Sequence, residues 1–105
     1  MITLIKGESL RVPATVDGDR NLITSIEAVI KKSARGEVPI DTAAVVATVS
    51  VVEFDSVQVP DGYMFTLVNT SALLPGIYYL NYKYIVGGLT YKGDPMKIVV
   101  KESVI

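Results

Sequence analysis

Few side chains in this chain of 105 residues are of the types that perform catalysis. Histidine and cysteine are both absent, so the commonest general acid–base residue and the usual ligands of zinc and haem are missing. Glu53 and Asp55 alternate on one predicted strand face, as a pair of carboxylates for general acid–base chemistry could. No activated serine motif accompanies them. We therefore expect a protein that is not an enzyme.

Carboxylate oxygens could instead bind calcium. Asp17, Asp19 and Asp61 are the candidates, but the segment Asp17-Gly18-Asp19 lacks the downstream glutamate of an EF-hand loop and is typical of a hydrogen-bonded turn. The tripeptides at 35–37 (RGE) and 92–94 (KGD) resemble integrin-binding sequences, yet both fall where turn residues are expected. We expect neither a metal site nor a cofactor.

Half of the residues are hydrophobic and the mean hydropathy is +0.41, which is high for a soluble monomer. Either a membrane segment or apolar surface buried against partners would explain this. The longest uncharged run, 62–82, is interrupted by Asn, Thr, Ser, Pro and Gly, whereas a spanning helix needs roughly 20 mostly apolar residues. The first six residues are too short for a signal peptide. The composition therefore favours burial against partners and no membrane association.

Charge is distributed unevenly, although the net charge is only −1. Residues 37–82 contain five acidic side chains and no Lys or Arg, while each flanking segment has an excess of two basic side chains. The simpler interpretation is that these segments lie side by side in one chain and compensate one another. The alternative is head-to-tail electrostatic matching between subunits. No basic cluster is dense enough to indicate nucleic-acid binding.

Hydrophobic and polar residues alternate with a period of two through most of the chain, which is the primary signal of β-strands. Pro13 indicates an edge strand or a bulge, because proline cannot donate a ladder hydrogen bond. Gly87-Gly88 predicts a two-residue hairpin. The residues predicted to face the core are Leu10, Val12, Ala14, Val16, Tyr63, Phe65, Leu67, Tyr78, Leu80, Tyr82, Tyr84, Met96, Ile98 and Val100.

The segment 21–35 fits two periodicities. Ile26, Ala28 and Ile30 alternate as in a strand, while a helical stripe that also includes Leu22 and Val29 would make a short helix. Its β-branched residues and its strand-like neighbours favour a strand. The whole chain, 1–105, is then predicted to form one all-β domain, an antiparallel Ig-like β-sandwich of about seven short strands.

The segment 42–52 carries no charge and bears most on function. Val45, Ala47, Val49 and Val51 are predicted to share one face, and the other face holds Val46, Thr48, Ser50 and Val52. A sheet of a sandwich normally has one solvated face, and this second face is poorly suited to water. Two interpretations remain open: a central strand covered on both sides within its own domain, or a surface buried in an assembly. The candidate interface is therefore Val46, Thr48, Ser50 and Val52.

Tyr79 completes the candidate interface. It alternates with the predicted core tyrosines and so points to the other side of its strand. Exposed tyrosine is enriched at protein interfaces. One of the core tyrosine hydroxyls is expected to reach a backbone partner near a corner of the sandwich.

The C-terminal segment TSALLPGIYYLNYKYIVGGLTYKGDPMKIVV, 70–100, resembles the "L-P-x-G-x-Y-x-x-(D/N)" strand, hairpin and closing strand of small Ig-like β-sandwich virion proteins of tailed bacteriophages. The opening LIKGESLRVPATVDGD is similar to their "(R/K)-G-(D/E)-x-hydrophobic-x-hydrophobic" first strand. NLITSIEAVIKKS stands where they carry the next strand. Asn81 departs from the pattern, which more often has Asp. The resemblance covers about residues 2–100.

This resemblance implies assembly rather than chemistry. Such proteins serve as capsid decoration, head–tail or neck components, or baseplate domains, so we expect a virion structural protein assembled in the bacterial host cytoplasm. Its partners would be capsid, portal, neck or tail subunits, and it would be a homo-oligomer or present in many copies. The alternative is a carbohydrate- or cell-surface-binding β-sandwich module, which would show several exposed aromatic side chains around a groove.

Overall fold

The computed structural model describes residues 1–16, 20–33 and 38–104. Strands make up 57% of it and these ranges contain no α-helix, which confirms the all-β prediction. Within them, no helix is long and apolar enough to cross a membrane. The turn predicted at Asp17-Gly18-Asp19 and the tripeptide at 35–37 lie outside the described residues. The strands are β1 (Ile2–Ile5), β2 (Leu10–Ala14), β3 (Ile23–Lys31), β4 (Val45–Phe54), β5 (Gly62–Leu67), β6 (Gly76–Val86), β7 (Leu89–Lys92) and β8 (Met96–Lys101), and the 3-10 turn η1 (Arg20–Leu22) precedes β3.

The eight described strands form one nearly barrel-shaped sheet in the order β1-β8-β6-β3-β4-β5-β2, with β7 also paired to β6. Neighbours run antiparallel except β1 and β8, which are parallel, from Ile2 opposite Ile98 to Ile5 opposite Lys101. The prediction of a purely antiparallel sheet of about seven strands is therefore wrong at β1. This strand of four residues is too short to show a clear alternation, and its partner lies at the far end of the chain.

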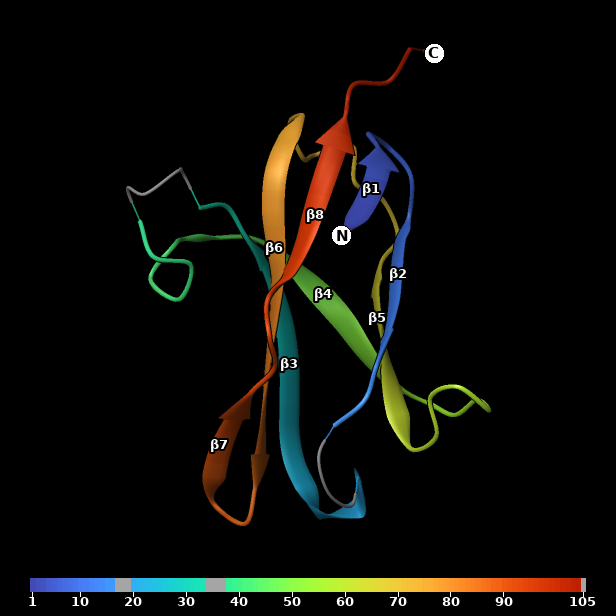
Figure 1. Ribbon diagram of the computed structural model, residues 1–105, viewed down its shortest axis with the longest axis vertical. Helices are drawn as coiled ribbons and strands as arrows, with labels where there is room; N and C mark the ends of the chain where they lie inside the picture. The colour runs from blue at the N-terminus through green and yellow to red at the C-terminus, as the bar shows by residue number, and fades with distance from the viewer. Residues whose placement is uncertain (17–19, 34–37, 105) are drawn as a thin grey trace.

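The strand β4 links the two halves of the sheet. Its first part pairs with β3, with Val49 opposite Ala28, and its second part pairs with β5, with Val51 opposite Phe65. In Figure 1 it crosses the molecule diagonally between these two neighbours. Strand β3 confirms the preference for a strand over a helix in the described part of 21–35, where the short turn η1 is the only helical segment.

The two ends of the sheet are held near each other by the turn between β1 and β2, which spans only residues 6–9. Thr70 fixes this turn from the loop before β6: its hydroxyl accepts from the Gly7 amide at 3.1 Å and donates to the Glu8 carbonyl at 2.7 Å. Thr70 has no exposed surface, so these bonds satisfy a hydroxyl that would be costly to bury alone. They close one end of the barrel without a β1–β2 ladder.

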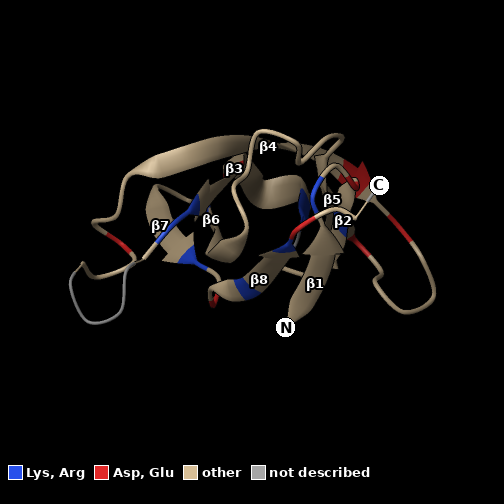
Figure 2. Ribbon diagram, turned by 90° about the horizontal axis from the view of Figure 1, so that it is seen from above, with Lys and Arg blue, Asp and Glu red and all other residues tan. Residues whose placement is uncertain are grey.

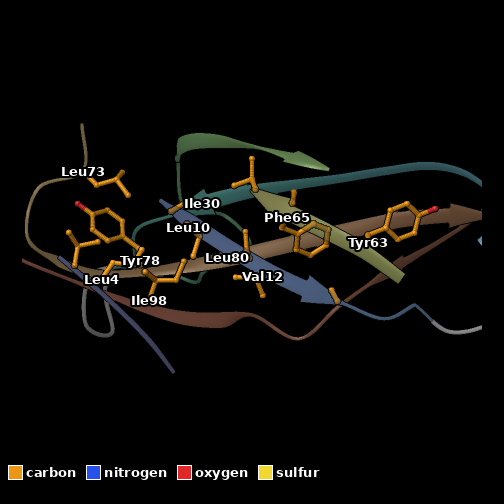
Figure 3. Close-up of a cluster of buried hydrophobic side chains, with 14 residues drawn as sticks. Leu4, Leu10, Val12, Ile30, Tyr63, Phe65, Leu73, Tyr78, Leu80 and Ile98 are labelled. Carbon is orange, nitrogen blue, oxygen red and sulfur yellow. The ribbon is translucent and has the colours of Figure 1, made fainter. Parts of the chain in front are cut away.

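The core lies inside this curved sheet, and side chains from β1, β2, β3, β5, β6 and β8 meet in it (Figure 3). Phe65, Leu80 and Ile98 are fully buried, as their positions in the alternation predict. Pro13 lies on β2 at one end of the strand order, so the predicted edge position is also confirmed. Tyr78 and Tyr84 are buried and Tyr82 is half-buried, in agreement with their assignment to the core face.

Glycines shape the path of the chain along β6. Gly87 and Gly88 have φ angles of 58° and 80°, the left-handed values that a type I′ hairpin needs, so the predicted hairpin between β6 and β7 is confirmed. Gly93 has another role: a Cβ atom there would overlap the ring of Tyr82. The Gly93 amide donates to the Tyr82 carbonyl at 3.1 Å, so the chain passes close to β6 between β7 and β8. This close approach explains the glycine of the KGD tripeptide.

The hydroxyl of Tyr78 donates to the Leu74 carbonyl, four residues upstream, at 2.6 Å. This is the predicted tyrosine–backbone bond, and it fixes the loop before β6 to the beginning of that strand. We expect Tyr78→Phe to lower the free energy of unfolding by about 1 kcal/mol, because the ring stays buried and only the hydrogen bond is lost. Urea denaturation would measure this. Tyr91→Phe is the matched control in an exposed tyrosine and should change stability by less than about 0.5 kcal/mol; equal effects of the two substitutions would contradict the assignment.

Candidate interaction surface

The outer face of β4 is open. Val46 and Val52 are 44% and 57% exposed, and Thr48 and Ser50 between them are exposed as well. The alternate residues Ala47, Val49 and Val51 pack against or within the core. β4 pairs with β3 along its first half, up to Val49, and with β5 along its second half, from Ser50 on, so each half has one neighbour. The strand is thus central, as one interpretation required, but its second face is not covered within the domain.

A β-bulge enlarges this face at its beginning. Between Ile30 and Lys31 the register shifts, so that Ile30 pairs with Ala47 and Lys31 with Val45. The extra residue on β4 changes which side the strand presents to the core. Val45 is 52% exposed as a result, and its predicted place on the core face is wrong. The bulge puts two consecutive valines on the surface.

Tyr79 lies on the same outer face but two strands away. It is half-buried on β6, opposite Lys31 of β3 on one side and Lys97 of β8 on the other. Lys31 in turn lies opposite Val45, so Tyr79 is joined to the first part of β4 through one row of side chains. Val52 lies about 20 Å further along β4 at the usual strand rise. The five candidate residues therefore share one surface without forming one cluster.

A groove of about 560 Å³ runs over this surface beside Tyr79. Its floor consists of outward side chains of β3, β6 and β7, and the loops before β4 and before β8 border it. Lys83 pairs with Glu27 at 2.9 Å, and the Lys31 ammonium donates to the Asp41 carbonyl at 3.0 Å. The residues that line its floor are Glu27, Val29, Lys31, Asn81, Lys83 and Lys92.

A charged cluster at the other end of β4 surrounds Arg20. Its guanidinium binds both oxygens of Asp55 at 3.2 Å, and it lies 4.0 Å from Glu53 and 3.9 Å from Asp61. It also donates to the Gly62 carbonyl at 3.1 Å. The Arg20 side chain is only 14% exposed, whereas the three carboxylates are 60–80% exposed. Within this cluster, a basic residue of the N-terminal segment compensates the acidic centre of the chain.

Partial burial acts to lower the pKa of Arg20, but the hydrogen bond to Asp55 and the charges of the three carboxylates outweigh it and raise the pKa. No local pattern in the sequence reveals this cluster, because Arg20 and its partners are separated by more than 30 positions. In the structure, the carboxylates of Glu53 and Asp55 therefore both pair with the Arg20 guanidinium. In the described part of the chain, no group of three or more Asp, Glu, His or Cys residues could hold a metal ion.

Comparisons with protein families, with curated proteins and with solved structures found no match for this chain.

Two buried tyrosines make the fold sensitive to alkaline pH. Burial raises the pKa of Tyr63 above 10.0, Glu53 raises it further and Arg20 opposes this. Burial also raises the pKa of Tyr78, against the bond to Leu74, which lowers it. Above about pH 10 the unfolded chain ionises these tyrosines first, so they should leave stability unchanged just below that pH and lower it above that pH. Urea midpoints between about pH 8 and pH 11 should fall less steeply for Tyr63→Phe than for the wild type or Tyr91→Phe; an unchanged slope would refute the assignment.

Proposed function

We propose that this chain is a small structural subunit of a tailed-bacteriophage virion. It acts by non-covalent assembly with capsid, neck or tail subunits, is present in many copies, and is assembled in the host cytoplasm. The resemblance of 2–100 to small phage virion proteins supports this class. The single observation that carries the assembly role is the uncovered, uncharged outer face of β4.

We propose further that the sheet is a variant of the Ig-like β-sandwich in which β4 passes from one layer to the other. Antiparallel pairs β2–β5, β3–β6 and β6–β8 support this, because they reproduce the neighbours of strands B and E, C and F, and F and G in that fold. The bond from Tyr78 back to Leu74 supports it too, since it has the form of a tyrosine corner.

The β4 face suits a protein partner for physical reasons. Valine and threonine have few rotamers, so ordering them at an interface costs little entropy. β4 pairs with β3 along its first half and with β5 along its second half, and the outward side chains of both halves would make the contact with a partner. A stable specific contact needs roughly 1,000 Å² of buried surface, which is more than one strand face supplies, and the adjoining faces of β3 and β5 would have to contribute.

Carbohydrate or cell-surface binding is the second candidate. The observation in its favour is a row of stacked rings: Tyr82 and Tyr84 have centroids 6.4 Å apart, and Tyr84 and Tyr91 5.6 Å apart. Only the last of these rings, Tyr91, is exposed, at 44%. A sugar platform normally presents several ring faces, so this observation supports the alternative less than the β4 face supports assembly.

A lysine on the β4 face tests the interface. Ser50→Lys should fold normally because Ser50 is exposed, but should abolish assembly because a buried, unpaired ammonium is strongly unfavourable at an interface. Thr3→Lys, at an exposed position of β1, is the matched control and should assemble like the wild type. Circular dichroism would check folding and native mass spectrometry would check assembly. Normal assembly of Ser50→Lys would contradict a role for this face.

The virion class itself is tested by the position of the gene and by the contents of particles. Capsid, portal or tail genes should flank the coding gene, and mass spectrometry of purified particles should detect the chain in many copies. Location in a metabolic operon, or absence from particles of a phage that encodes it, would overturn the class.

A further inference from the structure

We propose that the outer face of β4 is covered by a second copy of this chain, which packs the same face against it in the reversed strand direction. The face consists of Val46, Thr48, Ser50 and Val52. This rests on the proposed function and deepens it, because it names the partner that binds the same surface.

The side chains of this face form a nearly symmetric pattern. Valines occupy its two outer positions, 46 and 52, and hydroxyl residues occupy the two inner positions, 48 and 50. A two-fold axis that lies in the plane of the contact and passes across the strand between Thr48 and Ser50 reverses the strand direction. It places Thr48 over Ser50 of the second copy and Val46 over Val52 of the second copy. Apolar side chains then meet apolar ones, and hydroxyls meet hydroxyls.

The two inner hydroxyls favour a second copy over an apolar partner. A serine or threonine hydroxyl both donates and accepts hydrogen bonds, so Thr48 can bond Ser50 of the second copy, and the reverse contact occurs at the same time. A purely apolar partner surface would bury both hydroxyls without partners, which is unfavourable. The second copy supplies the matching groups because it carries the same two residues.

The centre of this contact carries no charge. Residues close to a two-fold axis meet the same residues of the other copy, so a charge there would face its own sign. The segment 42–52 has none, and the outward neighbours are uncharged too: Val29 lies opposite Thr48 on β3, and Thr66 lies opposite Ser50 on β5. On β3 and β2, charged side chains begin two positions or one strand further out: Glu27, Lys31 and Arg11. A centre depleted of charge within a polar rim is the usual anatomy of a protein interface.

The charges after β4 favour the reversed direction of the second copy. Three carboxylates, of Glu53, Asp55 and Asp61, surround the Arg20 guanidinium and leave an excess of two negative charges. The acidic positions of the loop between β4 and β5 lie on the right in Figure 2. Two β4 strands in the same direction would bring both acidic ends together, whereas reversed strands place them at opposite ends of the contact.

The size of the patch determines how strongly two copies should associate. It extends about 20 Å along β4 and about 15 Å across three strands at the usual spacings of a sheet. This is near the lower limit for a specific interface, so we expect a dissociation constant in the micromolar range.

Cysteine cross-linking tests the register of the contact. The chain contains no cysteine, so introduced thiols report this contact alone. A mixture of Thr48→Cys and Ser50→Cys should form disulfide-linked dimers at least about tenfold faster than either variant alone, because cysteines at the same position would lie about 7 Å apart along the strand. Thr3→Cys mixed with Ser50→Cys is the matched control and should link slowly. Intact mass spectrometry distinguishes the mixed dimers, since the two substitutions change the mass differently.

Removal of the hydroxyls tests why a second copy fits. Thr48→Val keeps the branched shape but leaves Ser50 of the second copy unpaired, so self-association of the full chain should weaken by about tenfold. Adding Ser50→Ala removes both partners and should restore most of the association. Thr90→Val, at an exposed position of β7, is the matched control and should associate like the wild type. Sedimentation velocity up to about 1 mM would give the dissociation constants, and circular dichroism would confirm folding.

A wild type that stays monomeric at that concentration, or same-position cysteines that link as fast as the mixed pair, would overturn the two-fold contact. Incorporation into particles decides the proposed function separately. If Ser50→Lys is lost from particles while the isolated wild type stays monomeric, the face binds another virion subunit and the proposed function stands. If the variants associate as expected but the chain is absent from particles, the contact stands and the virion class fails.

Discussion

The double pairing of β4 is the constraint on which the rest of the structure depends. Its first half completes the sheet of β3, β6 and β8, and its second half begins the sheet of β5 and β2. If β4 paired with only one of its two neighbours, β3 or β5, the two halves of the sheet would be joined by loops and by the core alone. Because β4 pairs first with β3 and then with β5, it carries the sheet from one half to the other, and Phe65 and Val49 are brought into one interior.

Two polar clusters fix parts of the chain that the pairing of β4 does not hold in place. Thr70 fixes the turn between β1 and β2, so the two ends of the strand order stay close together. Arg20 fixes the start of β3 to the end of β4 and to the beginning of β5 through Asp55 and Gly62. Both act where the chain leaves regular pairing and where backbone or carboxylate groups need partners.

Local patterns in the sequence predicted what depends on neighbouring residues, and failed for what depends on distant ones. Alternation placed Tyr78, Leu80 and Ile98 in the core, and Gly87-Gly88 predicted the hairpin, because a strand face and a tight turn are decided within a few residues. The parallel partner of β1 lies more than 90 positions away, and nothing local signals it. The exposed Val45 depends on a bulge opposite Lys31, and the contacts of Arg20 depend on the crossing of β4.

The position of β4 in the strand order also affects how readily this uncharged strand would pair with other chains. A strand of the same sequence at the edge of the sheet would offer a full row of unpaired backbone groups and would invite uncontrolled pairing with other chains. β4 instead has one paired neighbour along each half, and its outer valines attract a partner through shape and area, which are weak guides to orientation. Charge then supplies the orientation. The acidic cluster around Arg20 follows β4 directly, and a groove lined by three lysines and three carboxylates flanks its start, so the two ends of the apolar strip differ in charge. A partner that buries the strip therefore meets net negative charge at one end and charges of both signs at the other, and this difference distinguishes the two directions of docking.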